Sequence, residues 1–425
     1  MKTIAQIAAA LEGYDAASMP VPLVHAFISQ LVEPVPEVEP VSLREALGRV
    51  VALDVISPVD VPPHDNSAMD GYAFDGSQLQ RGEPLSLRSI GTALAGQAWR
   101  GRVAPGECVR IMTGAVLPPG LDTVVPQELA EAAGDVIRIP AAALQAGANR
   151  RRKGEDLRAG EPALRAGERL GPAALGLLAS LGLGSVQVRR RVRVAYFSTG
   201  DEILSPGESP REGAVYDSNR FSIFGLLTRL GCEVIDLGSI KDEPAALEAA
   251  LREAASLSDV ILTSGGVSGG DADFTRAMMK KLGDVAFWKI AMRPGRPMAV
   301  GRIAQGGNPA LLFGLPGNPV AVMVAFLAFV RPALLGMMGA REKATPLLRV
   351  RAAEPIRKKP GRTEYQRAVV STATDGSLHV MTTGDQGSGM LSSMVRANGL
   401  VVLDHARGDV AAGEEVGVMM FEGVL

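Results

Sequence analysis

The chain contains little cysteine. Its 425 residues include only Cys108 and Cys232, which lie far apart and form no C-x-x-C motif. This scarcity argues against a disulfide framework and against a structural zinc site. It also fits a reducing compartment, so we predict a cytoplasmic protein. Met1–Leu11 is Ala-rich but has no cleavage pattern, which favours a helix over a signal peptide.

The chain also lacks a strong net charge and a long apolar run. It has 44 Lys and Arg against 46 Asp and Glu, and the resulting net charge of −2 excludes a global field for nucleic acid. Any anion site must therefore be local. The most apolar segment, Val320–Val330, is followed by Arg331-Pro332, where we expect it to end. It is then too short to span a bilayer, so we predict a core helix and no membrane partner.

The length of the chain predicts two to four domains, because 425 residues are too many for one core. Prolines break up the first sixty residues, which predicts an extended beginning. Short β-like runs then follow between residues 75 and 150, as in a small β-rich domain. The clearest runs are Cys108–Ala115, Thr123–Val125 and Val136–Ile139.

From Val192 onward, strand-like runs alternate with helical ones. This alternation predicts a doubly wound, mostly parallel α/β domain. Such sheets bind ligands beyond the carboxyl ends of their strands, where the unusual loops of this chain stand. The expected strands are Val194–Phe197, Glu233–Leu237, Val260–Leu262, Phe287–Ile290, Met298–Arg302 and Ala310–Phe313, and the expected helices include Ser218–Leu230 and Pro244–Ser256.

The most distinctive loop lies within Val260–Phe274. After an apolar strand, it places four glycines, two serines and two aspartates within ten residues, and a helical stretch follows. Glycine frees successive N–H groups and lets the backbone approach an anion, so the loop suits phosphate. Asp271 and Asp273 would repel phosphate unless a cation such as Mg²⁺ lay between them. The alternative is a tight turn with solvated aspartates.

Three further polar stretches precede the α/β region. Asp65, Asn66, Ser67 and Asp70 stand within six residues, where such groups form local turns or bind a polar ligand. Thr113-Gly114-Ala115 ends a strand and offers a hydroxyl and free amides. The cations of Asn149–Asp156 are followed by Glu155 and Asp156, and they indicate either a solvated face or a phosphate contact.

The last eighty residues have a third composition. Their strand-like runs and the turn signals Asp375-Gly376 and Asn398-Gly399 predict hairpins in a small antiparallel barrel or sandwich. The expected strands are Leu347–Ile356, Glu364–Thr372, Leu378–Thr382, Leu400–Leu403 and Val416–Phe421. The expected domains are therefore an extended linking domain (1–58 and 152–190), a small β-rich domain (59–151), an α/β domain (191–338) and a C-terminal β-barrel (345–425).

Seven motifs in this order resemble one known family. They are Asp-Asn-Ser-Ala-Met-Asp-Gly-Tyr-Ala (65–73), Met-Thr-Gly-Ala (112–115), Arg-Arg-Lys-Gly-Glu-Asp (151–156), Ser-Thr-Gly-Asp-Glu (198–202), Thr-Ser-Gly-Gly-Val-Ser (263–268), Arg-Pro-Gly-Arg-Pro (293–297) and Gly-Leu-Pro-Gly-Asn-Pro (314–319). From about residue 20 to its end, the chain resembles the molybdopterin molybdenumtransferases of the bacterial MoeA type, whose animal relative is the gephyrin E domain. The resemblance implies insertion of molybdate into adenylylated molybdopterin, with Mg²⁺-dependent cleavage of the adenylate to AMP.

The resemblance also implies roles for residues at the matching positions. Arg293 and Arg296 stand where many relatives have lysine, which keeps the charge but changes the hydrogen-bond geometry. The implied magnesium and phosphate-side carboxylates are Glu202, Asp242 and Asp273, and Asp70 would orient substrate or help to deprotonate water or a thiol. The implied substrate-binding residues are Asn66, Ser67, Thr113 and Asp156 from the front of the chain, Gly265, Gly266 and Ser268 around phosphate, Lys289, Arg293, Arg296, Arg362 and Ser388 around the oxyanion, and Pro316, Asn318 and Pro319 in the loop that shapes the site.

Family members are elongated homodimers whose active site lies between the α/β domain of one subunit and the front domains of the other. The implied substrates are small molecules, and the possible protein partners are a molybdopterin adenylyltransferase and apo-molybdoenzymes. Two alternatives remain. One is the adenylyltransferase itself, whose fold resembles residues 192–335 alone, and the other is a non-catalytic molybdopterin-binding scaffold. Consumption of ATP would indicate the adenylyltransferase and release of AMP the molybdenumtransferase, whereas ligand binding without turnover would indicate the scaffold.

Overall fold

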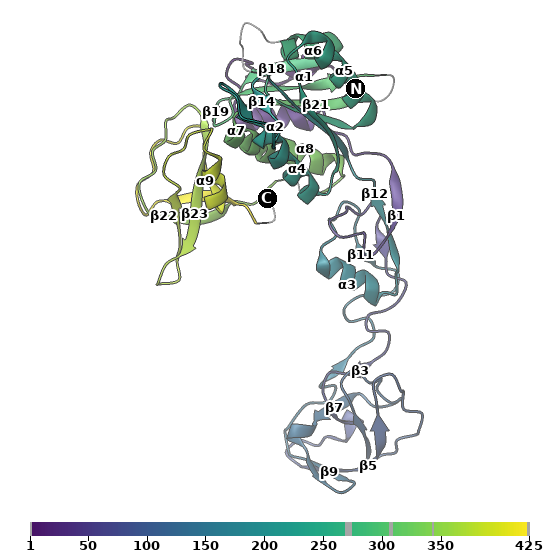
Figure 1. The fold of residues 1–425 in the computed structure, drawn as a ribbon. Helices are drawn as coiled ribbons and strands as arrows, with labels where there is room; N and C mark the ends of the chain where they lie inside the picture. The colour runs from purple at the N-terminus through teal and green to yellow at the C-terminus, as the bar shows by residue number, and fades with distance from the viewer. Residues whose placement is uncertain (1, 268–273, 306–308, 342–343, 423–425) are drawn as a thin grey trace.

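The structure, a computed structural model, describes residues 2–267, 274–305, 309–341 and 344–422. The molecule is elongated (Figure 1). An α/β domain and a C-terminal barrel lie side by side at one end, and a small β domain lies at the other. A narrow linking region joins the two ends, so that the small domain is far from the α/β domain of its own chain.

The α/β domain is built on a six-stranded sheet in the order β16-β13-β17-β21-β20-β18. The first four strands are parallel, β20 runs antiparallel to β21, and β18 runs antiparallel to β20, which confirms the expected mostly parallel sheet. The strands are β13 (Arg193–Thr199), β16 (Glu233–Ile240), β17 (Val260–Ser264), β18 (Gly283–Lys289), β20 (Pro297–Ile303) and β21 (Ala310–Leu315), and the helices are α4 (Ser218–Leu230), α5 (Pro244–Leu257) and α6 (Phe274–Leu282).

Local sequence signals explain this domain well. β17 and β21 are buried at every position, as continuous apolar runs inside a covered parallel sheet should be. α4 ends at Gly231, whose φ of 93° lies in the left-handed region that glycine adopts easily. α5 begins with Pro244, which suits the first turn because its missing N–H would have no helical partner there.

The prediction that Arg331-Pro332 ends the apolar helix is wrong. α7 (Pro319–Ala325) continues through a π-helical turn, η3 (Phe326–Val330), into α8 (Arg331–Met337). The Arg331 N–H donates to the Phe326 carbonyl, five residues back, and this wider turn accommodates the ring and missing donor of Pro332.

The expectation that this apolar segment is too short to span a bilayer is also wrong, because the helical run is continuous over Pro319–Met337. By length and composition it is the one helical run among the described residues that could cross a bilayer, with a mean hydropathy of 2.1. However, 89% of its most apolar window is buried inside the protein. The run therefore forms the core helix that we expected, although it is longer than the sequence suggested.

The residues expected to form the linking domain occupy two places. α1 (Ile4–Ala10) and α2 (Val21–Ser29) pack against the α/β domain, where the Met19 N–H donates to the Lys289 carbonyl at 3.0 Å. The ring of Phe27 on α2 lies edge-on to Trp288, at 4.8 Å between centroids. The linking region itself consists of the pairs β1 (Val38–Ser42) with β12 (Ser185–Arg189) and β2 (Val55–Ile56) with β11 (Pro162–Leu164), together with α3 (Pro172–Ser180).

The small β domain has one six-stranded sheet in the order β7-β4-β6-β5-β9-β8. Its strands are β4 (Gly71–Phe74), β5 (Leu85–Ala93), β6 (Glu107–Ile111), β7 (Thr123–Pro126), β8 (Glu131–Ala133) and β9 (Val136–Ile139), with short 3₁₀ turns at Gly76–Gln78 and Gln127–Leu129. β3 (Asn66–Ser67) pairs with β10 (Arg150–Arg151) where the chain enters and leaves the domain. The expected β-rich domain is present.

The C-terminal region is a closed five-stranded barrel, because β25 pairs with β26 on one side and with β23 on the other. Its strands are β22 (Leu348–Ala352), β23 (Thr363–Thr372), β24 (Leu378–Thr382), β25 (Gly399–Leu403) and β26 (Glu415–Met420), and α9 (Leu391–Arg396) precedes β25. β19 (Met292–Arg293) of the α/β domain pairs with β23 and so joins the two bodies.

One of the two predicted hairpin turns in the barrel is wrong. Asp375-Gly376 does join the paired strands β23 and β24. Asn398-Gly399 instead follows α9, and the Asn398 amide exchanges two hydrogen bonds of 2.8 Å with the Val370 backbone. The amide thus continues the strand pairing through its side chain.

Candidate active site

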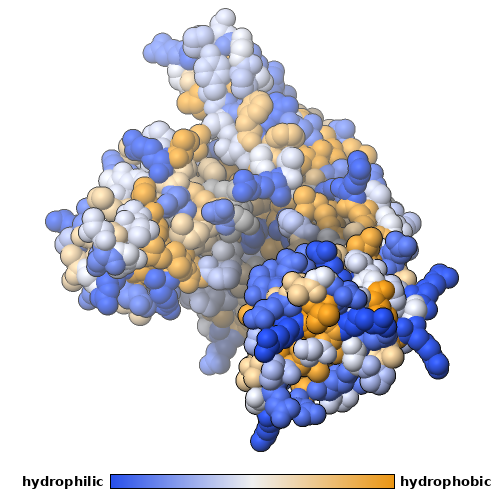
Figure 2. All heavy atoms as spheres, turned by 90° about the horizontal axis from the view of Figure 1, so that it is seen from below, coloured by the Kyte–Doolittle hydropathy of each residue, from blue (hydrophilic) through white to orange (hydrophobic). Residues whose placement is uncertain are grey.

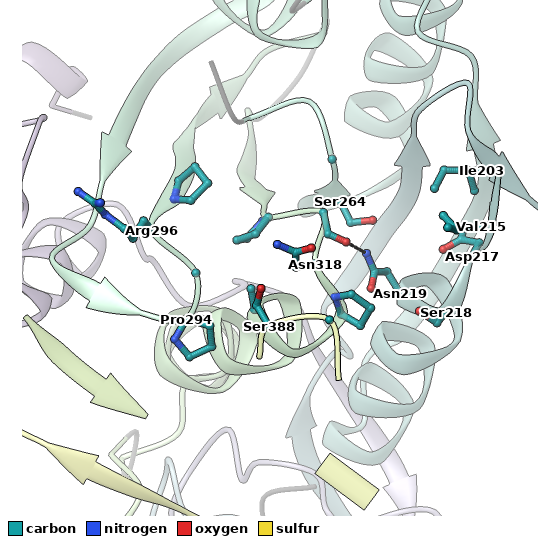
Figure 3. Close-up of a pocket in the computed structure, with 18 of the residues that line it drawn as sticks. Ile203, Val215, Asp217, Ser218, Asn219, Ser264, Pro294, Arg296, Asn318 and Ser388 are labelled. Carbon is teal, nitrogen blue, oxygen red and sulfur yellow. Dashed lines mark hydrogen bonds between the residues drawn. The ribbon is translucent and has the colours of Figure 1, made fainter. Parts of the chain in front are cut away.

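A cavity of about 910 Å³ lies at the carboxyl ends of β13, β17 and β21. Three stretches that carry the motifs 198–202, 263–268 and 314–319 meet there, through Thr199 and Glu202, Ser264 and Gly265, and Pro316–Pro319. The barrel closes one side with Arg362, Gln386 and Ser388. Figure 3 shows Ser388 facing Asn318 across the cavity, so the site lies between the α/β domain and the barrel.

Close backbone approach explains the glycine at the end of β17. Gly265 has a φ of 93°, and a Cβ there would lie 2.5 Å from the Thr199 carbonyl oxygen. Any other residue would separate the two loops that form the floor of the cavity. Gly266 packs against Thr275 and does not line the cavity. Ser268 and Asp273, together with Asp271, lie outside the described residues.

The basic side of the cavity carries Arg293 and Arg296. Both side chains are exposed, and neither appears in an ion pair between described residues. Arg362 also lines the cavity, but its Nε and Nη2 each lie 2.8 Å from Oε1 of the buried Glu364. Arg293 and Arg296 therefore have the more available donors for an oxyanion. Lys289 is exposed at the end of β18 and does not line the cavity.

Two of the three predicted metal-binding carboxylates can be placed. Glu202 lines the cavity after β13, and Asp242 follows the neighbouring strand β16. Thr275 Oγ1 donates to Asp242 Oδ1 at 3.3 Å. No group of three His, Cys, Asp or Glu side chains that could hold a metal is found among the described residues. Two carboxylates at adjacent strand ends fit the oxygen chemistry of Mg²⁺, although Asp242 does not itself line the cavity.

The predicted front residues gather at the other end of the molecule. The backbone N–H and Oγ1 of Thr113 both donate to Asp70 Oδ1 at 2.7 Å. Asn66 and Ser67 form β3 beside them, and the Asp156 N–H donates to the Val61 carbonyl at 3.0 Å. Figure 1 places β3 far from the α/β domain and the barrel, whose residues line the cavity, so one chain does not bring the two sets together.

The hydrogen bonds from Thr113 lower the pKa of the Asp70 carboxyl below its ordinary value. Asp70 is therefore ionised at neutral pH and is a weak base, which favours an orienting role over proton abstraction. Because the pKa is lowered in the folded state, its contribution to stability is present above the unfolded pKa of about 3.9 and is lost as the pH falls through the folded value.

Replacing Thr113 with valine is expected to raise the pKa of Asp70, because the variant keeps the backbone donor but loses the hydroxyl donor. A carboxyl-carbon NMR titration measures this change directly. Thr92→Val, at an exposed position on β5, is the matched control and should leave the Asp70 titration unchanged. An unchanged Asp70 pKa in T113V would show that the backbone donor alone sets it.

Family profiles match the chain in three consecutive parts. They are the MoeA N-terminal region (domains I and II) over residues 19–182, a probable molybdopterin-binding domain over 195–336, and the MoeA C-terminal region (domain IV) over 349–421. A molybdopterin molybdenumtransferase from Haemophilus influenzae is 40% identical over 93% of this chain and 98% of its own length. The chain belongs to the molybdopterin molybdenumtransferase family. A second such transferase, from Nostoc sp., is 34% identical over 90% of this chain and 88% of its own length.

Solved structures agree with this membership. The molybdopterin biosynthesis moeA protein from Pyrococcus horikoshii OT3 matches with a TM-score of 0.79 at 27% identity, over 95% of this chain and all of that chain. The match to this structure covers nearly the whole chain and is not confined to the α/β domain. The adenylyltransferase alternative would account for the α/β domain only.

Arg367 supports the cavity but was not among the site residues predicted from the sequence. Its side chain is 0% exposed, and its Nε donates to Ser393 Oγ at 2.9 Å. Its two Nη atoms donate to the carbonyls of Asp385, Gln386 and Gly387. The same loop continues to Ser388, whose carbonyl accepts from the Val320 N–H at 3.1 Å. Arg367 therefore fixes the barrel loop that closes the cavity. No sequence signal distinguishes it, because the same strand also carries the polar Glu364 and Gln366.

Replacing Arg367 with methionine is expected to destabilise the protein by about 3 kcal/mol, because several buried acceptors lose a charged donor. The loop should also loosen, which would raise the KM for the substrate more than it lowers kcat. Thermal unfolding and steady-state kinetics measure the two effects. Arg349→Met, at an exposed position of the same barrel, is the control. A variant with unchanged stability would contradict the role of these contacts.

Proposed function

We propose that this protein inserts molybdate into adenylylated molybdopterin and cleaves the adenylate, giving molybdenum cofactor and AMP. One observation carries this proposal: a single cavity combines the Gly265 turn with Arg293 and Arg296. Gly265 has no side chain, so the backbone there lets a phosphate approach closely, and two exposed guanidinium groups suit a tetrahedral oxyanion. The relatives named as molybdenumtransferases cover nearly the whole chain, which does not favour the adenylyltransferase or scaffold alternatives.

The residues of the cavity would position charge rather than form covalent bonds. Cleavage of a phosphoanhydride depends mainly on alignment and on neutralising the charge that develops on oxygen. Arg293 and Arg296 would hold the oxyanion, and the turn at Gly265 would hold the phosphates. Tetrahedral molybdate and tungstate present the same oxygens to these donors, so the set does not by itself favour one metal.

The protein's own thiols are unsuited to binding the metal. Cys108 and Cys232 are both buried and free, and burial raises the pKa of each thiol to about 12. Because thiolates rather than thiols ligate metals, neither cysteine is prepared for this role. The sulfur ligands would therefore come from the dithiolene of the substrate, whose soft donors suit molybdenum. The free, buried thiols also support the proposed cytoplasmic location.

We also propose Mg²⁺ as the cofactor, held by Glu202, Asp242 and the predicted Asp273. When bound, the ion would neutralise charge on the phosphate oxygens during cleavage. Glu202 lies on the cavity wall, and Asp242 lies at the adjacent strand end. Their oxygen atoms are the ligand type that Mg²⁺ prefers.

The proposed active unit is a homodimer. Asp70 and Thr113 lie too far from the cavity of their own chain, so a second chain must supply them if they act there (Figure 1). Large hydrophobic side chains are exposed on the linking region and around α4, as expected for an interface. They are Leu47, Leu53, Ile56, Val59, Val215, Tyr216, Phe221 and Phe224. Figure 2 also shows hydrophobic patches among the hydrophilic residues of the face seen from below.

The test mixes the purified protein with adenylylated molybdopterin and Mg²⁺, with and without molybdate, and measures AMP. We expect AMP release that depends on molybdate, together with a product that activates an apo-molybdoenzyme. Consumption of ATP without AMP release from the adenylylated substrate would instead indicate the adenylyltransferase reaction. Tight binding without any turnover would indicate a scaffold, and either result would overturn the proposal.

A further inference from the structure

The wall of the cavity formed by the start of α4 carries two buried oxygens without hydrogen-bond partners. Asp217 and Asn219 both line the cavity, and their side chains are only 4% and 8% exposed. Asp217 Oδ1 accepts from the Arg220 N–H at 3.0 Å and caps the helix. Asn219 Nδ2 donates to the Gly317 carbonyl at 2.7 Å. Among the described residues, Asp217 Oδ2 and Asn219 Oδ1 have no donor.

Nearby hydroxyl groups do not supply the missing donors. Tyr196 lies 2.8 Å from both Ser198 and Ser264, and the two serine hydroxyls are 3.3 Å apart. These three hydroxyl groups therefore satisfy one another, with Ser264 on the cavity lining and Tyr196 and Ser198 buried. A buried carboxylate oxygen and a buried amide oxygen without donors are unfavourable, so a ligand that brings two N–H groups would gain from meeting them.

The two sides of the cavity thus differ in hydrogen-bonding character. Figure 3 shows Arg296 on one side and Asp217 and Asn219 on the other, with Asn318 and Ser388 between them. The arginine side presents donors to anionic oxygens, whereas the two buried side-chain oxygens without partners on the α4 side are both acceptors. A matching ligand has an anionic end and an end rich in N–H groups.

We propose that Asp217 Oδ2 and Asn219 Oδ1 bind the 2-amino-4-oxo edge of the substrate's pterin ring. This inference rests on the proposed function, which supplies a pterin substrate. That edge carries a ring N–H beside an exocyclic amino group, so its two adjacent donors match two adjacent acceptors. Adenine presents its amino group beside a ring-nitrogen acceptor, which two oxygens would repel. The wall is therefore specific for the pterin and not for the adenylate.

Access to the two oxygens requires a local displacement, because neither is open to solvent. The neighbouring segment, which contains β14 (Ile203–Leu204) and β15 (Val215–Tyr216), can provide this displacement. It is held by these strands of two residues, which pair only with each other. Figure 3 places Ile203 and Val215 directly beside Asp217. Such a short pairing can open at little cost when a ligand replaces its contacts.

The test compares the binding of two probes by the full chain, using calorimetry at a pH where both rings are neutral. Pterin-6-carboxylate has the 2-amino group, and lumazine-6-carboxylate has a carbonyl oxygen in its place. We expect the pterin to bind about tenfold more tightly, because the lumazine oxygen would face an acceptor. Equal affinities would overturn the inference without the need for any variant.

Asp217→Asn then tests the residue itself. Asparagine caps a helix as well as aspartate does, so α4 should be kept while the charged acceptor is lost. The preference for pterin should disappear or reverse, and a preference that persists would overturn the inference. Asp75→Asn, which makes the same change at the cap of the Gly76–Gln78 turn in the small domain, is the matched control. AMP release tests the proposed function separately, so a protein that prefers pterin but releases no AMP would contradict only that function.

Discussion

Co-expression of an Asp70→Ala chain with a Glu202→Ala chain is expected to restore about a quarter of wild-type AMP release, although each variant alone is inactive. Asp70 lies in the small domain and Glu202 lines the cavity of the α/β domain, at opposite ends of one chain. If a site combines the two from different chains, a mixed dimer contains one site with both changes and one intact site. Half of the dimers are mixed at equal expression, so about a quarter of all sites are intact.

Two differently tagged chains, purified through both tags in sequence, isolate the mixed dimer for this measurement. Its activity should then approach half that of the wild type. Glu202→Ala combined with Asp242→Ala is the control, because both residues lie on the same domain and no intact site should form. Activity in the control, or its absence in the Asp70 and Glu202 mixture, would contradict a site shared between chains.

The parts of the site that follow strands could be predicted from the sequence. An apolar run such as Val260–Leu262 marks a buried strand, and a glycine after it marks a turn with an unusual backbone. Parallel strands place such turns at one edge, so the convergence of the three loops followed from the strand pattern alone. The structure confirms that convergence around a single cavity.

Contacts between distant segments were less predictable. Arg362 and Arg367 are only five residues apart in the sequence. Arg362 donates to the Glu364 carboxylate, whereas Arg367 donates to loop carbonyls. No periodicity distinguishes them, because the difference arises from the loop after β24 folding over β23. The helix end predicted at Pro332 was wrong for a similar reason. A π-helical turn accommodates this proline, and only the packed structure shows that turn. Local rules fail where tertiary contacts outweigh them.

Glu202→Gln and Asp242→Asn are each expected to lower AMP release by about 100- to 1,000-fold, the usual loss when one charged group no longer stabilises a transition state. Both changes preserve the shape of the side chain and remove its negative charge. If the two carboxylates hold Mg²⁺, the variants should also need a higher Mg²⁺ concentration for half-maximal rate. Steady-state AMP release over a range of Mg²⁺ concentrations measures both effects, and removal of the metal with a chelator should stop the wild-type reaction.

The pattern of the losses separates metal binding from other uses of the charge. If the replaced residue is a metal ligand, a higher Mg²⁺ concentration should restore most of the rate that its variant has lost, unless the residue also contacts the phosphates. Glu243→Gln, next to Asp242 and without a side-chain capping bond at the start of α5, is the matched control and should behave as wild type. If Asp242→Asn matches that control at every Mg²⁺ concentration, Asp242 holds Thr275 in place and has no part in the reaction. The cavity would then bind the ion through Glu202 and residues other than those of β16.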